Sequence, residues 1–238
     1  INVESYTRSV SVMVENSNII SKGGITDGIY LNVSYGIYAF SFYDSVLVTA
    51  IDGGSIYATG NNLEGEQSNS YGISAISNYG SVEIISRNGG SVKAIGGSTT
   101  NGSSYGINAE SDSGTVIMVN DGNIEAQGGN AAKDSYGISA ISDSGSVSVK
   151  SLDCGSIKAQ SGRTEGKYDN SYGIYARSDS KYVEIISENG SIKAQGGIAT
   201  NNDSYGIYTY SPSGNTKVIV TKNGRIDTQS EIATGGSY

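Results

Sequence analysis

Residues 171–196 read SYGIYARSDSKYVEIISENGSIKAQG, and the Ser-Tyr-Gly-Ile motif that opens this stretch recurs along the chain of 238 residues. The motif begins at six positions, which are Ser34, Ser70, Ser104, Ser135, Ser171 and Ser204. A further Ser-Tyr pair stands at Ser237 and Tyr238, and successive copies are 31–36 residues apart. Self-similarity at such a period indicates a repeat architecture, in which stacked copies bury a core that one copy cannot bury alone.

Each repeat contains three short segments in which apolar and other residues alternate with a period of two, as in β-strands. Six apolar residues mark the three strands of the quoted copy: Ile174, Ala176, Val183, Ile185, Ile192 and Ala194. Turns rich in Gly, Asp and Asn separate the strands. The sequence therefore predicts an all-β fold, a right-handed parallel β-helix of about seven coils with three strands per coil. Right-handed winding is expected because parallel crossovers are right-handed in most sheets.

We expect residues 1–238 to form a single β-solenoid, as a segment of a longer repeat array. Aligning residues 1–5 with the first strand of later copies places Val10 and Val12 on a second strand and Ile19 on a third. One coil buries about five sizeable apolar side chains, at roughly 1.5–3 kcal/mol each. Ordering one repeat costs on the order of 50 kcal/mol, so the coils must stack in order to fold.

Length differences between copies concentrate in the third corner, between the third strand and the next Ser-Tyr-Gly-Ile motif. The segment from each motif to the second strand has a constant length. Because surface loops tolerate insertions that leave the core intact, we expect the third-corner loops to make the contacts of the molecule. These loops lie at about residues 59–69, 95–103, 127–134, 160–170 and 195–203.

The composition excludes several classes of function. Fifteen Lys and Arg against 23 Asp and Glu give a formal net charge of -8, and the chain has no His. Nucleic acid and anionic membranes are disfavoured as partners because both require a basic face, and no apolar run is long enough for membrane insertion. Without His, Ser–His and Cys–His nucleophilic catalysis is excluded. No catalytic residue is predicted, and the single cysteine, Cys154, is expected to be incidental.

The stretch Ser-Tyr-Gly-Ile-Tyr-Ala, followed by a Val-rich strand and by Gly-Ser-Ile-Lys-Ala-Gln-Gly-Gly, resembles the repeats of bacterial surface β-helix proteins. These include the passengers of autotransporter-type and filamentous-haemagglutinin-like adhesins, and related carbohydrate-binding solenoids. The resemblance covers the whole chain. It implies secretion to the cell surface or the extracellular space, and an adhesive role.

Asp112, Asp143 and Asp179 occupy equivalent turn positions in three consecutive coils. Stacking would place their carboxylates in a column about 4.8 Å apart, which could hold Ca²⁺ with its six to eight oxygen ligands. Alternatively, each Asp closes its own Asx-turn. The second interpretation is favoured because Asn78 and Pro212 take the same position in other coils. The preferred prediction is therefore that the chain binds no cofactor, and calcium is the one alternative.

Five aromatic residues are expected to point outward from first strands: Tyr38, Phe40, Tyr175, Tyr208 and Tyr210. Exposed rings on a flat sheet can stack on sugar rings or on a protein partner. The same residues would also suit a cross-strand ladder that stabilises the sheet. The tyrosine of each Ser-Tyr-Gly-Ile motif alternates in phase with the inward Ile and Ala, which predicts a structural stack near a corner.

Three functions are compatible with these observations. The first is a non-catalytic structural or adhesive segment of an extracellular rod or filament, which associates end to end or contacts neighbouring coils of its parent chain. The second is a carbohydrate-binding β-helix, with or without the help of calcium. A glycan and a host cell-surface protein are both candidate partners. The third is a polysaccharide lyase or hydrolase, which would need clustered carboxylates in a specialised coil.

Overall fold

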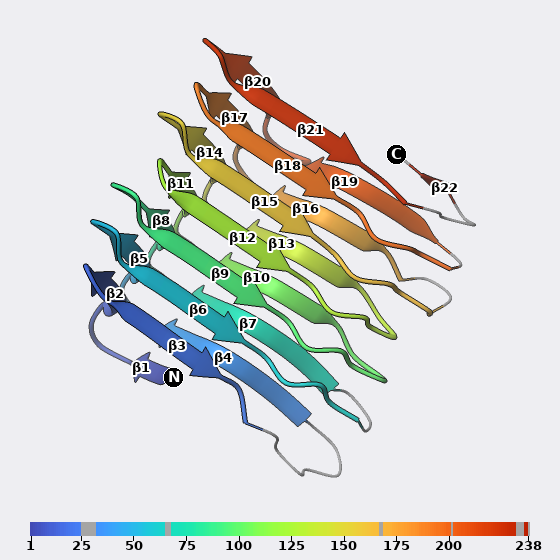
Figure 1. Ribbon diagram of the computed structural model, residues 1–238, viewed down its shortest axis with the longest axis horizontal. Helices are drawn as coiled ribbons and strands as arrows, with labels where there is room; N and C mark the ends of the chain where they lie inside the picture. The colour runs from blue at the N-terminus through green and yellow to red at the C-terminus, as the bar shows by residue number, and fades with distance from the viewer. Residues whose placement is uncertain (25–31, 65–67, 167–168, 201, 232–235, 238) are drawn as a thin grey trace.

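The computed structural model describes residues 1–24, 32–64, 68–166, 169–200, 202–231 and 236–237, and this part of the chain contains strands and no helix. The strands form three parallel sheets, and consecutive strands belong to different sheets. Figure 1 shows the layers stacked along one axis, from β1 (Asn2–Ser5) at one end to β20 (Thr216–Thr221), β21 (Arg225–Gln229) and β22 (Gly236–Ser237) at the other. The predicted parallel β-solenoid with three strands per coil is confirmed.

Each of seven layers contributes one strand to each sheet, and a short eighth strand adds to the first sheet. The first sheet carries the Ser-Tyr-Gly-Ile motif and consists of β1 (Asn2–Ser5), β4 (Asn32–Ser41), β7 (Ser68–Ser77), β10 (Ser104–Ser111), β13 (Ser135–Ser142), β16 (Ser171–Ser178), β19 (Asp203–Tyr210) and β22 (Gly236–Ser237). The second sheet consists of β2 (Val10–Glu15), β5 (Val46–Ile51), β8 (Val82–Ser86), β11 (Val116–Asn120), β14 (Val147–Leu152), β17 (Val183–Glu188) and β20 (Thr216–Thr221). The third sheet consists of β3 (Asn18–Lys22), β6 (Ser55–Thr59), β9 (Ser91–Ile95), β12 (Asn123–Gln127), β15 (Ser156–Gln160), β18 (Ser191–Gln195) and β21 (Arg225–Gln229).

Equivalent residues of successive layers lie directly beside one another in the core. Ile107 pairs with Ile73 of the previous layer and with Ile138 of the next, and all three side chains are fully buried. Val116 and Ile124 contribute to the same core from the other two sheets. The shortened first layer adds three residues in the predicted register: Val10, Val12 and Ile19. The period of two is therefore confirmed in the second and third strands and, after the motif glycine, in the first strand.

A serine closes the first corner of each layer and joins it to the previous layer. The Ser111 hydroxyl accepts a hydrogen bond from the Gly114 amide at 2.8 Å and donates one to the Gly80 carbonyl of the previous layer at 2.7 Å. Equivalent pairs of bonds are made by Ser41, Ser77, Ser142, Ser178 and Ser211. The predicted Asx-turns are wrong for Asp112, Asp143 and Asp179, because the serine before each Asp already accepts the hydrogen bond of the amide that the Asx-turn would need. We term this set of serine hydrogen bonds the serine relay.

The second corner places residues in the left-handed backbone region. Gly53 and Gly89 have φ angles of 76° and 75°. Cys154 takes the equivalent position of its layer with a φ of 72°, and its side chain is exposed. An L-residue costs roughly 1–2 kcal/mol in this region, so the fifth layer carries local strain that the glycine-containing layers avoid.

A fourth ladder, one residue wide, runs through the third corner. Five residues form it by parallel bridges: Leu63, Thr99, Ala131, Thr164 and Ala199. Their side chains are buried, and each stands seven residues after the first core residue of the third strand, as Leu63 does after Ile56. The length differences between copies therefore fall after the ladder. The third corner therefore begins with buried residues that pair between layers, and loops of variable length follow these residues.

The glycine of the Ser-Tyr-Gly-Ile motif interrupts the alternation of the first strand. A Cβ on Gly106 would lie 2.5 Å from the Gln127 amide nitrogen and 2.7 Å from the Gly137 carbonyl oxygen. Only glycine fits where the first strand approaches the end of the third strand. Tyr105 consequently lies on the outer face, where its ring stacks on Tyr136 with centroids 4.8 Å apart. The motif tyrosines thus do not share the inward direction of the Ile and Ala, whereas their predicted stacking is confirmed.

Candidate functional site

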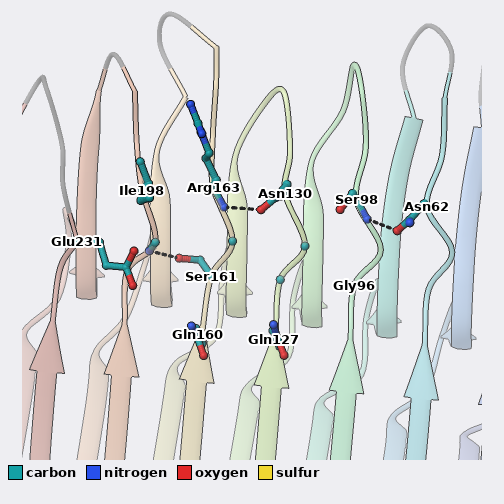
Figure 2. Close-up of a pocket in the computed structure, with 14 residues that line it drawn as sticks. Asn62, Gly96, Ser98, Gln127, Asn130, Gln160, Ser161, Arg163, Ile198 and Glu231 are labelled. Atoms are coloured by element: carbon teal, nitrogen blue, oxygen red, sulfur yellow. Dashed lines mark hydrogen bonds between the residues drawn. The ribbon is translucent and has the colours of Figure 1, made fainter.

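An open polar groove runs along the third corner, beside the carboxyl ends of the third-sheet strands (Figure 2). Its volume is about 460 Å³. It extends across the layers from Asn62 in the second layer to Glu231 in the seventh, and we term it the amide groove. Its defining side chains belong to Asn62, Gln127, Asn130, Gln160, Arg163 and Glu231.

Glutamine residues end four successive strands of the third sheet, β12, β15, β18 and β21, and two of these glutamines line the groove. Gln127, Gln160 and Gln195 lie in register. The Gln195 side-chain nitrogen donates to Glu231 Oε1 at 2.7 Å. Among the residues that the structure describes, the side chains of Gln127 and Gln160 have no hydrogen-bond partner, and both line the groove. Two primary amides, each with donors and an acceptor, are thus available to a ligand.

Asparagine side chains fix the loops beside these glutamines. Asn62 Oδ1 accepts a hydrogen bond from the Ser98 amide at 2.8 Å, and Asn130 Oδ1 accepts one from the Arg163 amide at 3.0 Å (Figure 2). Each bond joins the loop of one layer to the loop of the next. Arg163 Nε lies 3.3 Å from Glu165 Oε1, so the charge of Arg163 is paired at the rim.

A second hollow of about 380 Å³ adjoins the amide groove and shares Asn62, Ser98 and Asn130 with it. Leu63 and Ala131 of the fourth ladder form part of its lining. The third-corner loops were predicted from the sequence to make contacts, but the two hollows were not predicted. Strand ends and ladder residues, which lie outside the variable loops, supply much of the lining. The recurrence of Gln after Ala at the end of the third strand was the available signal.

The five aromatic residues named from the sequence lie on the outer face of the first sheet in two separate groups. Tyr38 stacks on Phe40 with ring centroids 6.3 Å apart. Tyr175 stacks on Tyr208 of the next layer at 5.5 Å and an interplanar angle of 2°, and Tyr210 is 44% exposed. In the three layers between the groups, no aromatic residue takes these positions: Ser74, Asn108 and Ser139 replace Tyr38, and Ile76, Glu110 and Ile141 replace Phe40. The rings therefore do not form one continuous binding platform.

A continuous stack of motif tyrosines lies beside these two groups: Tyr35, Tyr71, Tyr105, Tyr136, Tyr172 and Tyr205. The Tyr136 hydroxyl donates to Asp134 Oδ2 at 3.1 Å, and the Tyr205 hydroxyl donates to Asp203 Oδ2 at 2.8 Å. Burial raises the pKa of Tyr105 to about 12, so this hydroxyl remains protonated at neutral pH. These contacts make the stack a structural part of the sheet.

The column of aspartates lies at the first corner, at equivalent positions of three layers. Arg177 donates two hydrogen bonds of 2.6 Å to the Asp179 carboxylate and holds the pKa of Asp179 below its usual value. Within the described ranges, no group of three or more His, Cys, Asp or Glu side chains is arranged to hold a metal ion. Calcium binding by Asp112, Asp143 and Asp179 stays a prediction, and one of these carboxylates is already paired.

Three carboxyl groups with a raised pKa lie outside the amide groove, and burial is the main cause for each: Glu110, Asp134 and Asp169. Burial raises the pKa of Glu110, which is in register between Ile76 and Ile141 on the outer face of the first sheet. Burial also raises the pKa of Asp134, which accepts the hydrogen bond from Tyr136. Raised carboxyl pKa values are typical of catalytic sites. None of these three groups lines the groove.

No helix in the described part of the chain is long and apolar enough to span a membrane. A scan against models of protein families found no match, and a search of curated proteins also found none. A crystal structure of a TibC-catalyzed hyper-glycosylated TibA55-350 fragment matches at 12% identity and a TM-score of 0.12, over all of this chain and 97% of that one. So low a TM-score supports no conclusion. The fold and site define the chain as a parallel β-solenoid with an open polar groove.

Proposed function

We propose that the chain is a non-catalytic structural and adhesive segment of an extracellular β-solenoid. The observation that carries this proposal is the uniformity of the layers. The core ladders, the serine relay and the tyrosine stack repeat in register along the described chain. Repetition of this kind builds a rigid rod with extended lateral surfaces, which suits attachment to a partner. The resemblance of the motif to surface β-helix adhesins supports the same function.

Contacts between layers support the structural part of the proposal. On the outer face of the third sheet, Glu125 pairs with Lys93 at 2.9 Å and with Lys158 at 3.0 Å, in the layers on either side. Exposed ion pairs are individually worth about 0–1 kcal/mol. Together with the stacked tyrosines and the serine relay, they add polar and aromatic contacts between layers to the buried core.

Self-association is part of the proposal. Val218 and Val220 of β20 are 52% and 50% exposed, whereas Val183 and Ile185 of β17 are fully buried. Uncovered apolar side chains beside unpaired strand edges favour pairing with further strands, either from a neighbouring coil or from a second copy. Sedimentation equilibrium tests this part: a Val218→Lys and Val220→Lys double variant is expected to dissociate oligomers, and a wild-type chain that stays monomeric would overturn it.

Retention of cells under flow tests the adhesive part. Surfaces coated with the folded chain, with the heat-unfolded chain and with albumin would be compared for retention of bacteria and of cultured epithelial cells. We expect the folded chain to retain several times more cells than the two controls. Equal retention on the three surfaces would overturn the adhesive role, and release of sugar products from a polysaccharide incubated with the chain would overturn the non-catalytic assignment.

Carbohydrate binding by the outer face of the first sheet is a second candidate function. It is favoured by the exposed ring of Tyr210 and by the neighbouring Tyr175–Tyr208 stack. A glycan array with wild type and Tyr208→Ala, run with and without Ca²⁺, separates the candidates. Binding that is lost in Tyr208→Ala or on chelation would favour this face, and unchanged binding in both conditions would exclude it.

A further inference from the structure

We infer that the amide groove binds an uncharged polysaccharide that lies extended along the stacking axis of the layers. This inference rests on the proposed adhesive function and adds a binding site and a ligand class to it. The groove combines three properties that such a ligand requires. These are free amide groups at a regular spacing, a floor without side chains, and little net charge.

Gln127 and Gln160 supply the free amide groups. Their backbones pair in register on adjacent strands, so the two side chains start one strand spacing apart, about 4.8 Å. The rings of an extended pyranose chain follow one another at a similar interval, so successive rings can face successive amides. A primary amide donates and accepts hydrogen bonds, as a sugar hydroxyl does, so the two groups satisfy each other.

Glycine residues form the floor of the groove. A Cβ on Gly129 would lie 2.6 Å from the Gly97 backbone, and a Cβ on Gly162 would lie 2.4 Å from the Gly129 carbonyl oxygen. Successive layers are too close here for any side chain, so the floor remains flat and sugar rings can approach it. Ser161 holds the next loop in place by accepting a hydrogen bond from the Gly197 amide at 2.7 Å (Figure 2). This preformed surface lowers the ordering cost of binding.

The hydrogen bonds of the groove backbone argue against a peptide ligand. The Gly128 amide donates to the Gln160 carbonyl at 2.9 Å, and the Gly96 amide donates to the Gln127 carbonyl at 2.8 Å. A peptide that adds to a sheet needs a row of free N–H and C=O groups along an edge. Here adjacent layers already use these groups, and the side-chain amides remain for a polyhydroxyl ligand.

The charges around the groove favour an uncharged ligand. Glu231 accepts the hydrogen bond from Gln195 at one end, and Arg163 is paired with Glu165 at the rim. The two charged side chains that define the groove, Glu231 and Arg163, have opposite signs. The chain as a whole has a formal net charge of -8, which repels an acidic polymer at long range.

Isothermal titration calorimetry on the full chain tests the inference with defined oligosaccharides. The neutral probes are cellohexaose, xylohexaose and mannohexaose, the acidic probe is hexagalacturonate, and cellobiose, xylobiose and mannobiose test the effect of length. We expect at least one neutral hexasaccharide to bind with millimolar or tighter affinity, and more tightly than its own disaccharide, because the longer chain spans more layers. The Gln127→Ala and Gln160→Ala double variant is expected to weaken this binding about tenfold, which corresponds to ~1.4 kcal/mol.

Gln229→Ala is the matched control, because Gln229 takes the same position in the seventh layer but does not line the groove. Its affinity for the hexasaccharide is expected to equal that of wild type. The inference is overturned if no neutral hexasaccharide binds, if hexagalacturonate binds more tightly than all of them, or if the double variant binds as wild type does. Unfolding midpoints of both variants are expected to match wild type, because the substituted side chains make no hydrogen bond within the described chain.

Cell retention separates failure of this inference from failure of the proposed function. A chain that retains cells but binds none of the oligosaccharides would keep the adhesive function and lose this site. A chain that binds a neutral hexasaccharide but retains no cells would keep the site and lose the adhesive function.

Discussion

Asn120 in the fourth layer lies in register with Ser86 of the third layer, at a buried corner where the neighbouring layers have serine. The Ser86 hydroxyl donates a hydrogen bond to the Gly90 carbonyl at 2.7 Å, and Ser151 donates one to Gly155 at 2.8 Å. The side-chain nitrogen and oxygen of Asn120 are both buried and have no partner among the described residues. The fourth layer therefore lacks a bond that its neighbours make.

Replacing Asn120 by serine is expected to stabilise the fold. A buried polar group without a partner costs about 1–3 kcal/mol, and serine would regain the hydrogen bond made in the adjacent layers. We expect Asn120→Ser to raise the free energy of unfolding by about 1 kcal/mol in urea titrations. Asn123→Ser is the control, because Asn123 is exposed and pairs with serine on both sides. A loss of stability in Asn120→Ser would contradict the prediction.

Cys154→Gly is expected to raise the unfolding free energy by about 1 kcal/mol, since glycine adopts the left-handed backbone without steric strain. Gly53 and Gly89 already occupy this position in two other layers. Cys154→Ala removes the thiol but keeps the strain, so it is expected to show no gain. Thermal unfolding under reducing conditions measures both variants, and equal gains in the two would disprove the backbone explanation.

Gly106→Ala is expected to destabilise the fold by about 2 kcal/mol, because the new methyl group would overlap the backbone of β12 and β13. Gly24→Ala is the control, since a Cβ on Gly24 would have no atom within 4 Å. Urea unfolding of the two variants checks the prediction. Equal midpoints for Gly106→Ala and wild type would show that the first strand can move away from the third.

Glu110→Gln is expected to stabilise the fold at neutral pH. Burial raises the pKa of Glu110, and the charges of Asp112 and Asp143 add to this effect, so the folded state binds the proton more tightly than the unfolded chain. The unfolding free energy then falls as pH rises through the raised pKa and recovers as pH decreases. The advantage of Glu110→Gln over wild type should shrink toward acidic pH. Glu64→Gln, at an exposed position, is the control, and a constant advantage at every pH would refute this explanation.

Removal of calcium is expected to leave the unfolding temperature unchanged, because Arg177 already pairs with Asp179. Scans in EDTA and in millimolar CaCl₂ measure the effect. An increase of several degrees in calcium that disappears in Asp112→Asn would instead establish the calcium site of the aspartate column.

The repeated apolar residues were sufficient to predict the strands and their stacking. Ile107 and Ala109, two residues apart on β10, specify a side-chain period of two, and a slip by one residue would expose both of them. The direction of Tyr105 could not be obtained in this way. It depends on Gly106, whose lack of a side chain matters only where a second strand approaches it.

The candidate site was harder to predict from the sequence than the fold was. Gln127 and Asn130 are ordinary loop-side residues in one repeat, and they form a groove only because other layers bring Gln160 and Asn62 alongside. The serine relay was hidden for a related reason. Serine and aspartate are both turn formers, and only the register shows that the serine hydroxyl reaches the preceding layer.

The serine relay gives the stack a direction. Ser142 donates to the Gly114 carbonyl of the preceding layer at 2.7 Å, whereas it accepts only from the Gly145 amide of its own turn. A newly formed layer thus finds its acceptor on the neighbour closer to the amino terminus. Since the ribosome releases the amino terminus first, each corner can serve as a template for the next one synthesised, and folding can proceed in the order of translation.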